Sequence, residues 1–418
     1  MDKAAAFSGL SRDAILRILR SLIHASLTTP GSVAPPGLTR QLFDPGVSVL
    51  ELADLAMGDE GLGVDSLALI DAAAGVSRFF GLGTTGRDDY LLMSDCLGDW
   101  ADLVTDHLSE KGVLAEFVFQ TSGSVDHPKS VTHRLEHLLD EVVIFSPTLF
   151  DPAPTRIVGM VPPHHIYGFL FTCLYPEIVP CAVEDVTRRP PGAVQRLLRP
   201  GDLIVGTPQN WASLLSDDTS IPAGVFGVVS AGPVPADLWD NARSAGLDRL
   251  VEVYGATETG GIGWRVSPFD PYRLLPHLER VGGGITGRCA GDVRKPQDCL
   301  AWEGDQRFTL QGRCDKAVQV AGVNVSLQRV RSELSVTYGV AEMAVRLDGS
   351  RLKAFLVPAD PNMCPSALIE YVSNCARDLL PPPARPAHYT VGPVLPRNAM
   401  GKPTDWVVQG SVASDAGD

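Results

Sequence analysis

The sequence lacks the cysteine pairs that mark extracellular disulfide frameworks and zinc sites. Its eight cysteines occur singly, with no C-x-x-C pair and no Cys/His ligand spacing. We therefore expect free thiols in a reducing compartment rather than disulfides or metal ligands. The first residues also lack the charged and then apolar pattern of a signal peptide, so the sequence predicts a cytoplasmic protein.

Basic clusters and long apolar runs are scarce too. Lys and Arg are scattered without a basic stripe, and the net charge of the 418 residues is −14, which argues against nucleic acid as a partner. The longest apolar stretch, from about Ile166 to Val183, contains Pro176, Glu177 and Pro180 and so predicts no membrane span.

The chain is long enough for two or three domains, and the pattern of predicted helices and strands changes twice along it. We expect a helical region over residues 1–112, an α/β core over residues 113–314 and a small α+β domain over residues 315–418. Helical patterns in the first region are Ala14–Ile23, the one-sided spacing of Leu69, Ala73, Val76 and Phe80, and Leu97–Leu108. In the last region, strands are expected at Val318–Val320 and Val323–Val325, and helices at Leu327–Tyr338 and Pro365–Leu380. The tail after Val408 is small and polar, and we expect it to be disordered.

Short, continuous apolar runs alternate with helical stretches in the core. These runs are Phe117–Phe119, Ile157–Val161, Leu203–Val205, Val225–Val229 and Leu250–Tyr254. Such alternation predicts a mostly parallel sheet that is covered on both faces. Ligands then bind beyond the carboxyl ends of the strands, where polar or glycine-containing motifs follow four of the runs.

A polar loop, Thr121–Lys129, follows the first of these runs. It combines small hydroxyl residues, glycine and lysine, so its N–H groups and hydroxyls can surround phosphate oxygens while the lysine adds a charge. Its spacing differs from the G-x-x-x-x-G-K-[ST] loop of P-loop NTPases, and a plain turn is the alternative. The candidate phosphate-binding residues are Thr121, Ser122, Gly123, Ser124 and Lys129.

This loop resembles the T-S-G-S-T-G-x-P-K-G loop of the acyl-adenylate-forming superfamily, which includes acyl- and aryl-CoA ligases and peptide-synthetase adenylation domains. Segments that resemble its later motifs follow in order: Pro162–Phe169 (P-x-x-H-x-x-G), Tyr254–Thr259 (Y-G-x-T-E), Gly312–Asp315 (G-R-x-D) and Leu395–Lys402 (L-P-x-x-x-x-G-K). The resemblance covers about residues 113–408. It implies a compact adenylate-forming α/β fold with a helical N-terminal region, a mostly parallel-sheet core and a small mobile α+β C-terminal domain.

The resemblance implies that ATP and Mg²⁺ bind beside the Y-G-x-T-E segment. Tyr254, Gly255 and Thr257 would contact the nucleotide, since glycine lets the backbone approach closely and the threonine can bind the α-phosphate. Glu258 would hold Mg²⁺ on the triphosphate, because a hard cation prefers carboxylate oxygen. The alternative is a polar turn after a strand, closed by a helix N-cap.

The later motifs would complete nucleotide binding and catalysis. By resemblance, Arg313 and Asp298 bind the ribose, although Asp298 lacks the usual T-G-D context. Asp315 would be the hinge on which the C-terminal domain turns. Lys402 would then neutralise charge as the carboxylate attacks the α-phosphate.

The P-x-x-H-x-x-G segment implies where the acid binds. By resemblance, His165 lines the carboxylate pocket and takes part in catalysis; a hydrogen-bonded core histidine is the alternative. Residues around the same strand ends would complete the pocket: Phe169, Ser230, Ala231, Gly232 and Gly260. Their aromatic and glycine character favours a flat aryl ring over a long alkyl chain.

The phosphate loop departs from the superfamily pattern. Val125, Asp126 and Ser130 stand where Thr, Gly and Gly are usual, and a carboxylate beside a polyphosphate is electrostatically unfavourable. Besides an active adenylate-forming enzyme, a second hypothesis is therefore a binding or regulatory protein that no longer adenylates.

A third hypothesis concerns the N-terminal region. Leu62–Leu67 resembles the phosphopantetheine site of acyl carrier proteins, with Ser66 in the place of the modified serine. The alternative is that Asp65 or Ser66 simply caps a helix.

The subfamily that the chain resembles most is the compact ligases of aryl polyene and xanthomonadin-type pigment clusters. These are thought to activate hydroxybenzoates and load them on an acyl carrier protein. The resemblance therefore implies an acid–thiol ligase that adenylates a small aryl acid and passes it to an acyl carrier protein. Transfer to CoA, in an acyl- or aryl-CoA ligase, is the alternative.

Overall fold

The structure is a computed structural model of the chain. It describes residues 7, 9–28, 38–44, 51–57, 62–94, 96–121, 129–215, 219–282, 284–287, 293–313, 317–335, 337–396 and 405–408. The chain divides into two compact units. Unit 1 comprises residues 1–120, 130–296 and 301–309, and unit 2 comprises residues 121–129, 297–300 and 310–418.

A large mixed sheet forms the centre of unit 1. Among the described residues its nine strands run in the order β13-β14-β9-β8-β7-β6-β5-β3-β4. The stretch β4-β3-β5-β6-β7 is parallel, and β8, β9 and β14 continue it antiparallel. The strands are β3 (Arg156–Gly159), β4 (Ala182–Asp185), β5 (Asp202–Gly206), β6 (Phe226–Val229), β7 (Arg249–Ala256), β8 (Gly260–Arg265), β9 (Tyr272–Leu274), β13 (Asp298–Glu303) and β14 (Arg307–Arg313).

The central strands are buried on both faces. Every residue of β3 and β5 is buried, which is the burial expected for parallel strands that lie between two layers. The apolar runs at Ile157, Leu203, Val225 and Leu250 are therefore confirmed as strands of the parallel part of this mixed sheet. The expected α/β arrangement of a sheet with helices is confirmed as well.

The first apolar run lies elsewhere. It forms β1 (Glu116–Gln120), which pairs antiparallel with β2 (Ser130–Arg134) in a separate two-stranded sheet. The hairpin arises because the polar loop brings the chain straight back: Thr121 N donates to the carbonyl oxygen of Lys129 at 2.9 Å. Three further strands form a small antiparallel sheet: β10 (Leu278–Val281), β11 (Gly284–Gly287) and β12 (Val293–Arg294).

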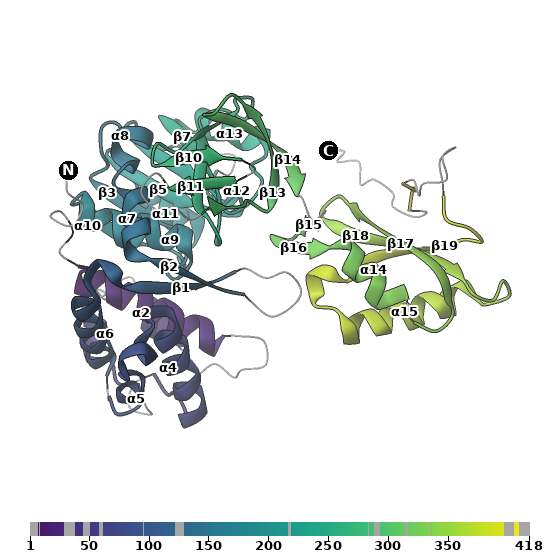
Figure 1. Cartoon of the computed structure of the whole chain (residues 1–418), viewed down its shortest axis with the longest axis horizontal. Coiled ribbons are helices and arrows are strands. Elements are labelled where there is room, and N and C mark those ends of the chain that lie inside the picture. Colours follow the sequence, from purple (N-terminus) through teal and green to yellow (C-terminus); the bar gives the residue numbers. More distant parts are fainter. Residues whose placement is uncertain are drawn as a thin grey trace. The chain divides into compact units, whose positions relative to one another are not determined.

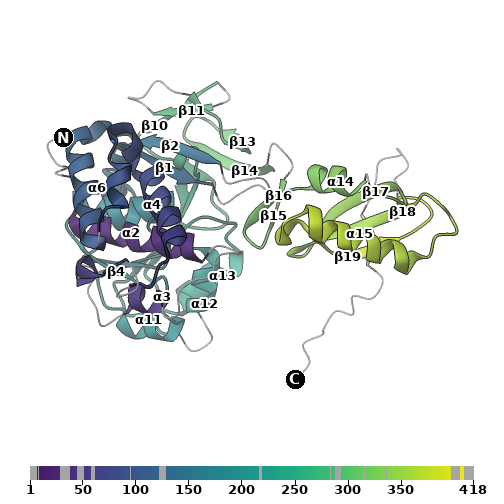
Figure 2. The same cartoon turned by 90° about the horizontal axis from the view of Figure 1, so that it is seen from below.

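Helices cover both faces of the large sheet. On one face α11 (Pro191–Leu197), α12 (Pro208–Leu214) and α13 (Ala236–Ser244) pack in one apolar cluster with the strands, and Figure 2 shows these helices together. On the other face a π-helical turn, η4 (Leu170–Leu174), places Thr172 against Gly159 of β3. The other helices of this part are α7 (Leu135–Val142), α8 (Phe145–Leu149), α9 (Ile166–Phe169) and α10 (Tyr175–Ile178).

The N-terminal helices belong to the same unit as the large sheet. The helical patterns at Ala14, Leu69 and Leu97 are confirmed as α2 (Arg12–Leu27), α4 (Ser66–Phe80) and α6 (Leu97–Lys111). Figure 1 shows these helices grouped with α5 (Asp88–Leu91) beside β1 and β2. Shorter elements complete this region: α3 (Leu38–Phe43), η1 (Glu51–Asp54), η2 (Leu82–Thr85) and η3 (Gly112–Leu114).

Unit 2 contains the expected small α+β arrangement. Strands β17 (Val340–Asp348) and β18 (Arg351–Pro358) are antiparallel, and β19 (Pro386–Val391) joins β18 in parallel. Alternate residues of the strands face α14 (Leu327–Ser335) and α15 (Pro365–Leu379), whereas Phe355 on the opposite face packs on Trp406. The remaining elements are β15 (Ala317–Val320), β16 (Val323–Ser326) and η5 (Pro382–Ala384).

Two expectations about the whole chain can be compared with the described residues. Cys299 is disulfide-bonded, so the expectation that every cysteine is a free thiol is wrong for this residue; single spacing along the sequence does not exclude a pair that folding brings together. The other cysteines placed in the structure are free thiols: Cys96, Cys173, Cys181, Cys364 and Cys375. Within the described ranges, no helix combines the length and the apolar character needed to cross a membrane.

Candidate active site

The carboxyl ends of the parallel strands gather several of the predicted site residues in unit 1. His165 follows β3, Ser230 follows β6, and Thr257 follows β7. Neighbouring parallel strands end at the same edge, so these segments leave the sheet on one side. The Tyr167 hydroxyl donates to the carbonyl oxygens of Gly206 at 3.2 Å and Val228 at 3.0 Å, which joins the segment after β3 to β5 and β6.

Close packing explains the spacing of the P-x-x-H-x-x-G segment. A Cβ on Gly168 would lie less than 3.0 Å from the carbonyl oxygen of Pro162. Only glycine therefore fits where α9 packs against the residues that precede it. His165 then stands immediately before this helix, with an extended backbone. The side chain of His165 is exposed, and desolvation by the surrounding protein lowers its pKa.

His164 is held more firmly than its neighbour. Its Nδ1 lies 2.8 Å from Ser21 Oγ on α2, and its ring centroid is 4.5 Å from that of His165. Burial, with a smaller contribution from the charge of His165, lowers the pKa of His164 to about 3. His164 is therefore neutral at physiological pH.

The segment after β6 has an unusual backbone. Ala231 has a φ of +68°, a left-handed conformation that is uncommon for a residue with a side chain. It stands between Ser230 and Gly232, the two other residues predicted for the acid pocket here. Strained backbone of this kind concentrates at functional sites, which supports that prediction.

The Y-G-x-T-E segment forms a tight turn between β7 and β8. A Cβ on Gly255 would lie less than 3.0 Å from the carbonyl oxygen of Gly260, so glycine is required by the turn itself. Ala256 N donates to Thr259 Oγ1 at 3.2 Å, which closes the turn. Thr257 and Glu258 are half-buried at its tip, whereas Tyr254 packs against the rings of Tyr272 and Phe308.

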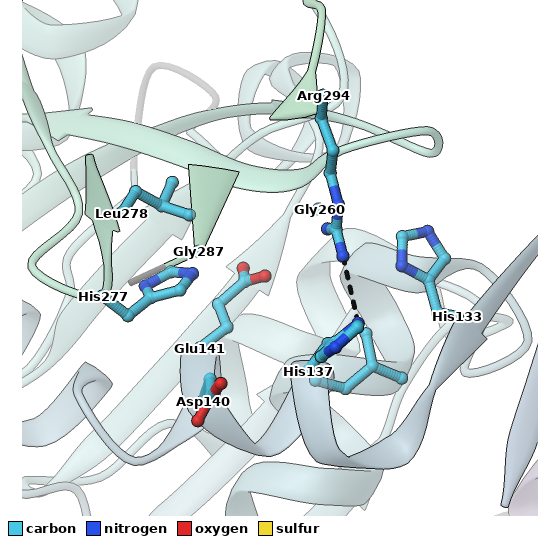
Figure 3. A pocket seen from close by; sticks show the side chains of 10 residues that line it. His133, His137, Asp140, Glu141, Gly260, His277, Leu278, Gly287 and Arg294 are labelled. Carbon is cyan, nitrogen blue, oxygen red and sulfur yellow. Dashed lines mark hydrogen bonds between the residues drawn. The ribbon is translucent and has the colours of Figure 1, made fainter. Parts of the chain in front are cut away.

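Three residues that the sequence did not single out bind the backbone of this turn. His133 Nε2 lies 2.6 Å from the carbonyl oxygen of Thr257, and Arg294 Nη1 lies 2.8 Å from that of Thr259. Glu141 accepts from Gly261 N, at 3.0 Å to Oε1 and 3.1 Å to Oε2. Figure 3 shows the side chains of His133, Glu141 and Arg294 around one small pocket.

Burial shifts the pKa of two of these residues in opposite directions. Desolvation raises the pKa of Glu141 to about 7, against smaller effects of the Gly261 N–H and the Arg294 charge. Desolvation also lowers the pKa of His133 to about 4, although its bond to Thr257 opposes the shift. Neutral His133 must carry its proton on Nε2, because a carbonyl oxygen can only accept.

Two of the predicted pocket residues are deeply packed. Phe169 is fully buried among aromatic rings, with its centroid 4.7 Å from that of Phe117 and 5.5 Å from that of Phe119. Gly260 is buried beside Glu141, where a Cβ would lie less than 3.0 Å from the carboxylate. Their place in the acid pocket stays a prediction.

Other predicted residues lie in unit 2 or outside the described residues. Thr121 and Lys129 close the base of the phosphate loop, with Lys129 N donating to Thr121 Oγ1 at 3.2 Å. Asp298 is the first residue of β13, and Arg313 is the last residue of β14, described only by its backbone. Ser122, Gly123, Ser124, Asp315 and Lys402 lie outside the described residues.

The turn fits a magnesium–nucleotide complex better than a protein-only metal centre. No group of three or more His, Cys, Asp or Glu side chains among the placed residues could hold a metal ion. Glu258 offers carboxylate oxygens on a partly open turn next to the Thr257 hydroxyl. One carboxylate that shares the cation with substrate phosphates is the arrangement that Mg²⁺ prefers.

Comparison with known proteins agrees with this geometry. The family described as AMP-binding enzyme matches residues 114–287. A 4-coumarate–CoA ligase of Rhodobacter capsulatus is 42% identical over 361 residues, which cover 84% of this chain and 92% of that protein. A 4-coumarate–CoA ligase of Cereibacter sphaeroides is 40% identical over 355 residues, covering 84% of this chain and 86% of that protein.

A solved structure shares the fold at lower identity. The o-succinylbenzoate CoA synthetase of Bacillus subtilis aligns with a TM-score of 0.53 and 19% identity, over 76% of this chain and 73% of that chain. Its similarity concerns the fold alone, whereas the ligases above share sequence along most of their length. The chain therefore belongs to the AMP-binding family of adenylate-forming acid–thiol ligases.

Proposed function

We propose that this chain is an aryl-acid–CoA ligase that acts on a 4-hydroxycinnamate-type acid. The observation that carries the proposal is its extended identity to two relatives that are named 4-coumarate–CoA ligase. The reaction would consume the acid, ATP and CoA and release the aryl-CoA thioester, AMP and pyrophosphate. The binding residues and the two half-reactions are inferred from the motif residues.

The acid would bind at the strand ends of unit 1. His165 is exposed there, and its lowered pKa keeps it neutral at physiological pH, so it can hydrogen-bond a carboxylate without forming a fixed ion pair. Ser230, Ala231 and Gly232 would line the ring-binding side. Phe169, which lies in the aromatic core, would support the pocket from behind.

ATP would bind through both polar motifs. Thr121, Ser122, Gly123, Ser124 and Lys129 would hold the phosphates, since backbone N–H groups, hydroxyls and an ammonium all stabilise phosphate oxygens. At the turn after β7, Gly255 would let the nucleotide approach, with Tyr254 beside it, and Thr257 would bind the α-phosphate. Glu258 would hold Mg²⁺, which offsets the charge of the triphosphate. Arg313 and Asp298 would bind the ribose.

Two half-reactions would follow. An acid oxygen attacks the α-phosphorus, and the bond to pyrophosphate breaks, which gives the acyl-adenylate. Lys402 would stabilise the negative charge that develops at this step. A rotation at Asp315 would then admit the thiol, whose sulfur attacks the acyl carbon as AMP leaves.

The proposed acceptor differs from the one that the sequence suggested. The expectation of an acyl carrier protein rested on the resemblance to the ligases of aryl polyene and xanthomonadin-type pigment clusters. The two relatives above are named for CoA, which favours free CoA. A hydroxybenzoate substrate and a role in pigment synthesis have no support from those names.

The first test is carboxylate-dependent ATP–pyrophosphate exchange with cinnamates, benzoates and fatty acids. The proposal predicts exchange that is strongest with hydroxycinnamates, followed by aryl-CoA formation when CoA is added. No exchange with any acid would favour a protein that has lost adenylation. Strong exchange only with benzoates or fatty acids would contradict the proposed substrate class.

A further inference from the structure

Three side chains from different elements meet the backbone of one turn. We call His133 on β2, Glu141 on α7 and Arg294 on β12 the turn brace. His133 bonds to the carbonyl oxygen of Thr257 at 2.6 Å, and Arg294 bonds to that of Thr259 at 2.8 Å. Glu141 accepts from the N–H of Gly261 at 3.0 Å. Every second residue of the segment that carries Glu258 is thus held through its main chain.

Two members of the brace, His133 and Glu141, are buried, which raises the free-energy cost of losing their hydrogen bonds. His133 is 3% exposed and Glu141 is 4% exposed, so water cannot replace a lost partner without entering the protein. Two glycines of the turn leave room for the carboxylate of Glu141. A Cβ at Gly260 or Gly261 would lie less than 3.0 Å from Glu141 oxygens, so both glycines are needed for this contact.

The pocket beside the brace is too small for a substrate. Its volume is about 20 Å³, enough for roughly one water molecule. His137 and His277 are among the other residues that line it, and Arg294 Nη2 lies 3.3 Å from His137 Nδ1. The cluster in Figure 3 therefore acts on the turn, and not on a ligand of its own.

The brace also links the turn to the strand that follows the polar loop along the chain. β2 begins at Ser130, directly after Lys129 of the phosphate loop. His133 stands on that strand and bonds to Thr257. A displacement of β2 would therefore be transmitted to the carbonyl next to Glu258.

We infer that His133, Glu141 and Arg294 are positioning residues for ATP binding and adenylation. They fix the main chain of Thr257–Gly261 so that the side chains of Thr257 and Glu258 keep the direction needed at the triphosphate. The inference rests on the proposed function for the role of the turn. A displacement of about 1 Å at a reacting centre can cost on the order of 100-fold in rate, so a loose turn would be costly.

Paired substitutions separate the polar contacts from side-chain volume. His133→Leu and Glu141→Leu keep bulk and remove the bond, whereas His133→Gln and Glu141→Gln restore a donor or an acceptor. Glu116→Leu on β1, the strand that pairs with β2, is the matched control, since Glu116 is exposed and pairs with Arg134. Arg294 is only half-buried, so Arg294→Met keeps the test available should the buried Leu variants not fold.

The first readouts need no acid substrate. In folded variants we expect amide hydrogen exchange in a peptide that covers Thr257–Gly261 to rise at least about 10-fold in the Leu and Met variants. The affinity for Mg·ATP should fall by about 10-fold or more, and the Gln variants should recover most of both losses. Unchanged exchange and unchanged Mg·ATP affinity in folded His133→Leu, Glu141→Leu or Arg294→Met would overturn the inference.

Kinetics then distinguish positioning from general damage. The KM for ATP should rise or kcat should fall by about 10- to 100-fold in ATP–pyrophosphate exchange. Thioester formation from a pre-formed aryl-adenylate should change less than about 3-fold. Equal losses in both half-reactions would overturn the inference. If the proposed function is wrong, the unmodified enzyme forms no thioester. Hydrogen exchange and Mg·ATP affinity of the variants would still test whether the brace positions the turn.

Discussion

Ser21 and His164 are joined by a hydrogen bond of 2.8 Å between Oγ and Nδ1, although 143 positions separate them. Arg20, next to Ser21 on α2, forms a buried ion pair with Asp185 at 2.6 Å. The N-terminal helix is therefore attached directly to the strand ends that carry His165. This attachment places the N-terminal helix next to the acid site proposed above.

Ser21→Ala should raise the KM for the acid by about 3- to 10-fold, because one net hydrogen bond of about 0.5–1.5 kcal/mol is lost behind His165. The KM for ATP should stay nearly constant. Steady-state kinetics with each substrate varied in turn would measure both. Ser26→Ala is the matched control, since that hydroxyl on the same helix donates to the carbonyl oxygen of Ile23 within the helix. An unchanged KM for the acid in Ser21→Ala would contradict the link.

Lys402→Ala should cripple adenylation by about 100-fold or more, since it removes one electrostatic contact to the transition state. Transfer from a pre-formed aryl-adenylate should remain nearly intact. Single-turnover measurements of each half-reaction would separate the two. Losses of equal size in both would show that the lysine is structural.

Glu258→Gln should raise the Mg²⁺ concentration needed for half-maximal exchange, because a hard cation prefers a charged oxygen ligand. The fold should survive, since the side chain lies at the half-buried tip of a turn. A magnesium titration alongside a thermal melt would check both statements. Normal magnesium dependence, or an unfolded variant, would refute the assignment.

The sequence predicted elements better than contacts. Continuous apolar runs such as Leu203–Val205 identified buried strands, because burial on both faces leaves no polar alternation. The turn brace could not be predicted, since Glu141 and Gly261 are 120 positions apart and nothing local marks a carboxylate that folding buries. The adjacent glycines after Thr259 were the one available signal. Gly260 is also a predicted residue of the acid pocket, and Glu141 packs against both glycines.

The pKa of Glu141 predicts an unusual pH dependence of stability. Because burial raises it from 4.5 to about 7, its stabilising contribution is full below pH 4.5 and is lost as the pH rises through 7. The charged and titratable groups around it are His133, His137, Asp140, His277 and Arg294. The slope attributable to Glu141 should approach 1.4 kcal/mol per pH unit at most.

Glu141→Gln should remove that slope between pH 4.5 and 7. Denaturant unfolding at several pH values would compare the variant with the unmodified protein. His133 has the opposite effect, since its lowered pKa of about 4 gives stability above pH 6.5 that is lost as the pH falls through 4. Parallel curves for Glu141→Gln and the unmodified protein would contradict the raised pKa.

Ser66 should act as the first residue of a helix and not as an attachment site. Asp65 caps α4 by accepting from Ala68 N at 2.8 Å, so Asp65→Ala should lower the free energy of unfolding by about 1 kcal/mol. Ser66→Ala should have little effect on stability or on thioester formation. Intact mass after treatment with CoA and a phosphopantetheinyl transferase would reveal modification, and a gain on Ser66 would revive the carrier hypothesis.

A competition between two acceptor thiols tests the proposed ligase reaction in one experiment. The enzyme is mixed with ATP, Mg²⁺, 4-coumarate, CoA and a phosphopantetheinylated carrier protein, and every thioester is followed by mass. We expect 4-coumaroyl-CoA as the main product, with AMP and pyrophosphate in equal amounts. Loading of the carrier without acyl-CoA, or no thioester at all, would contradict it.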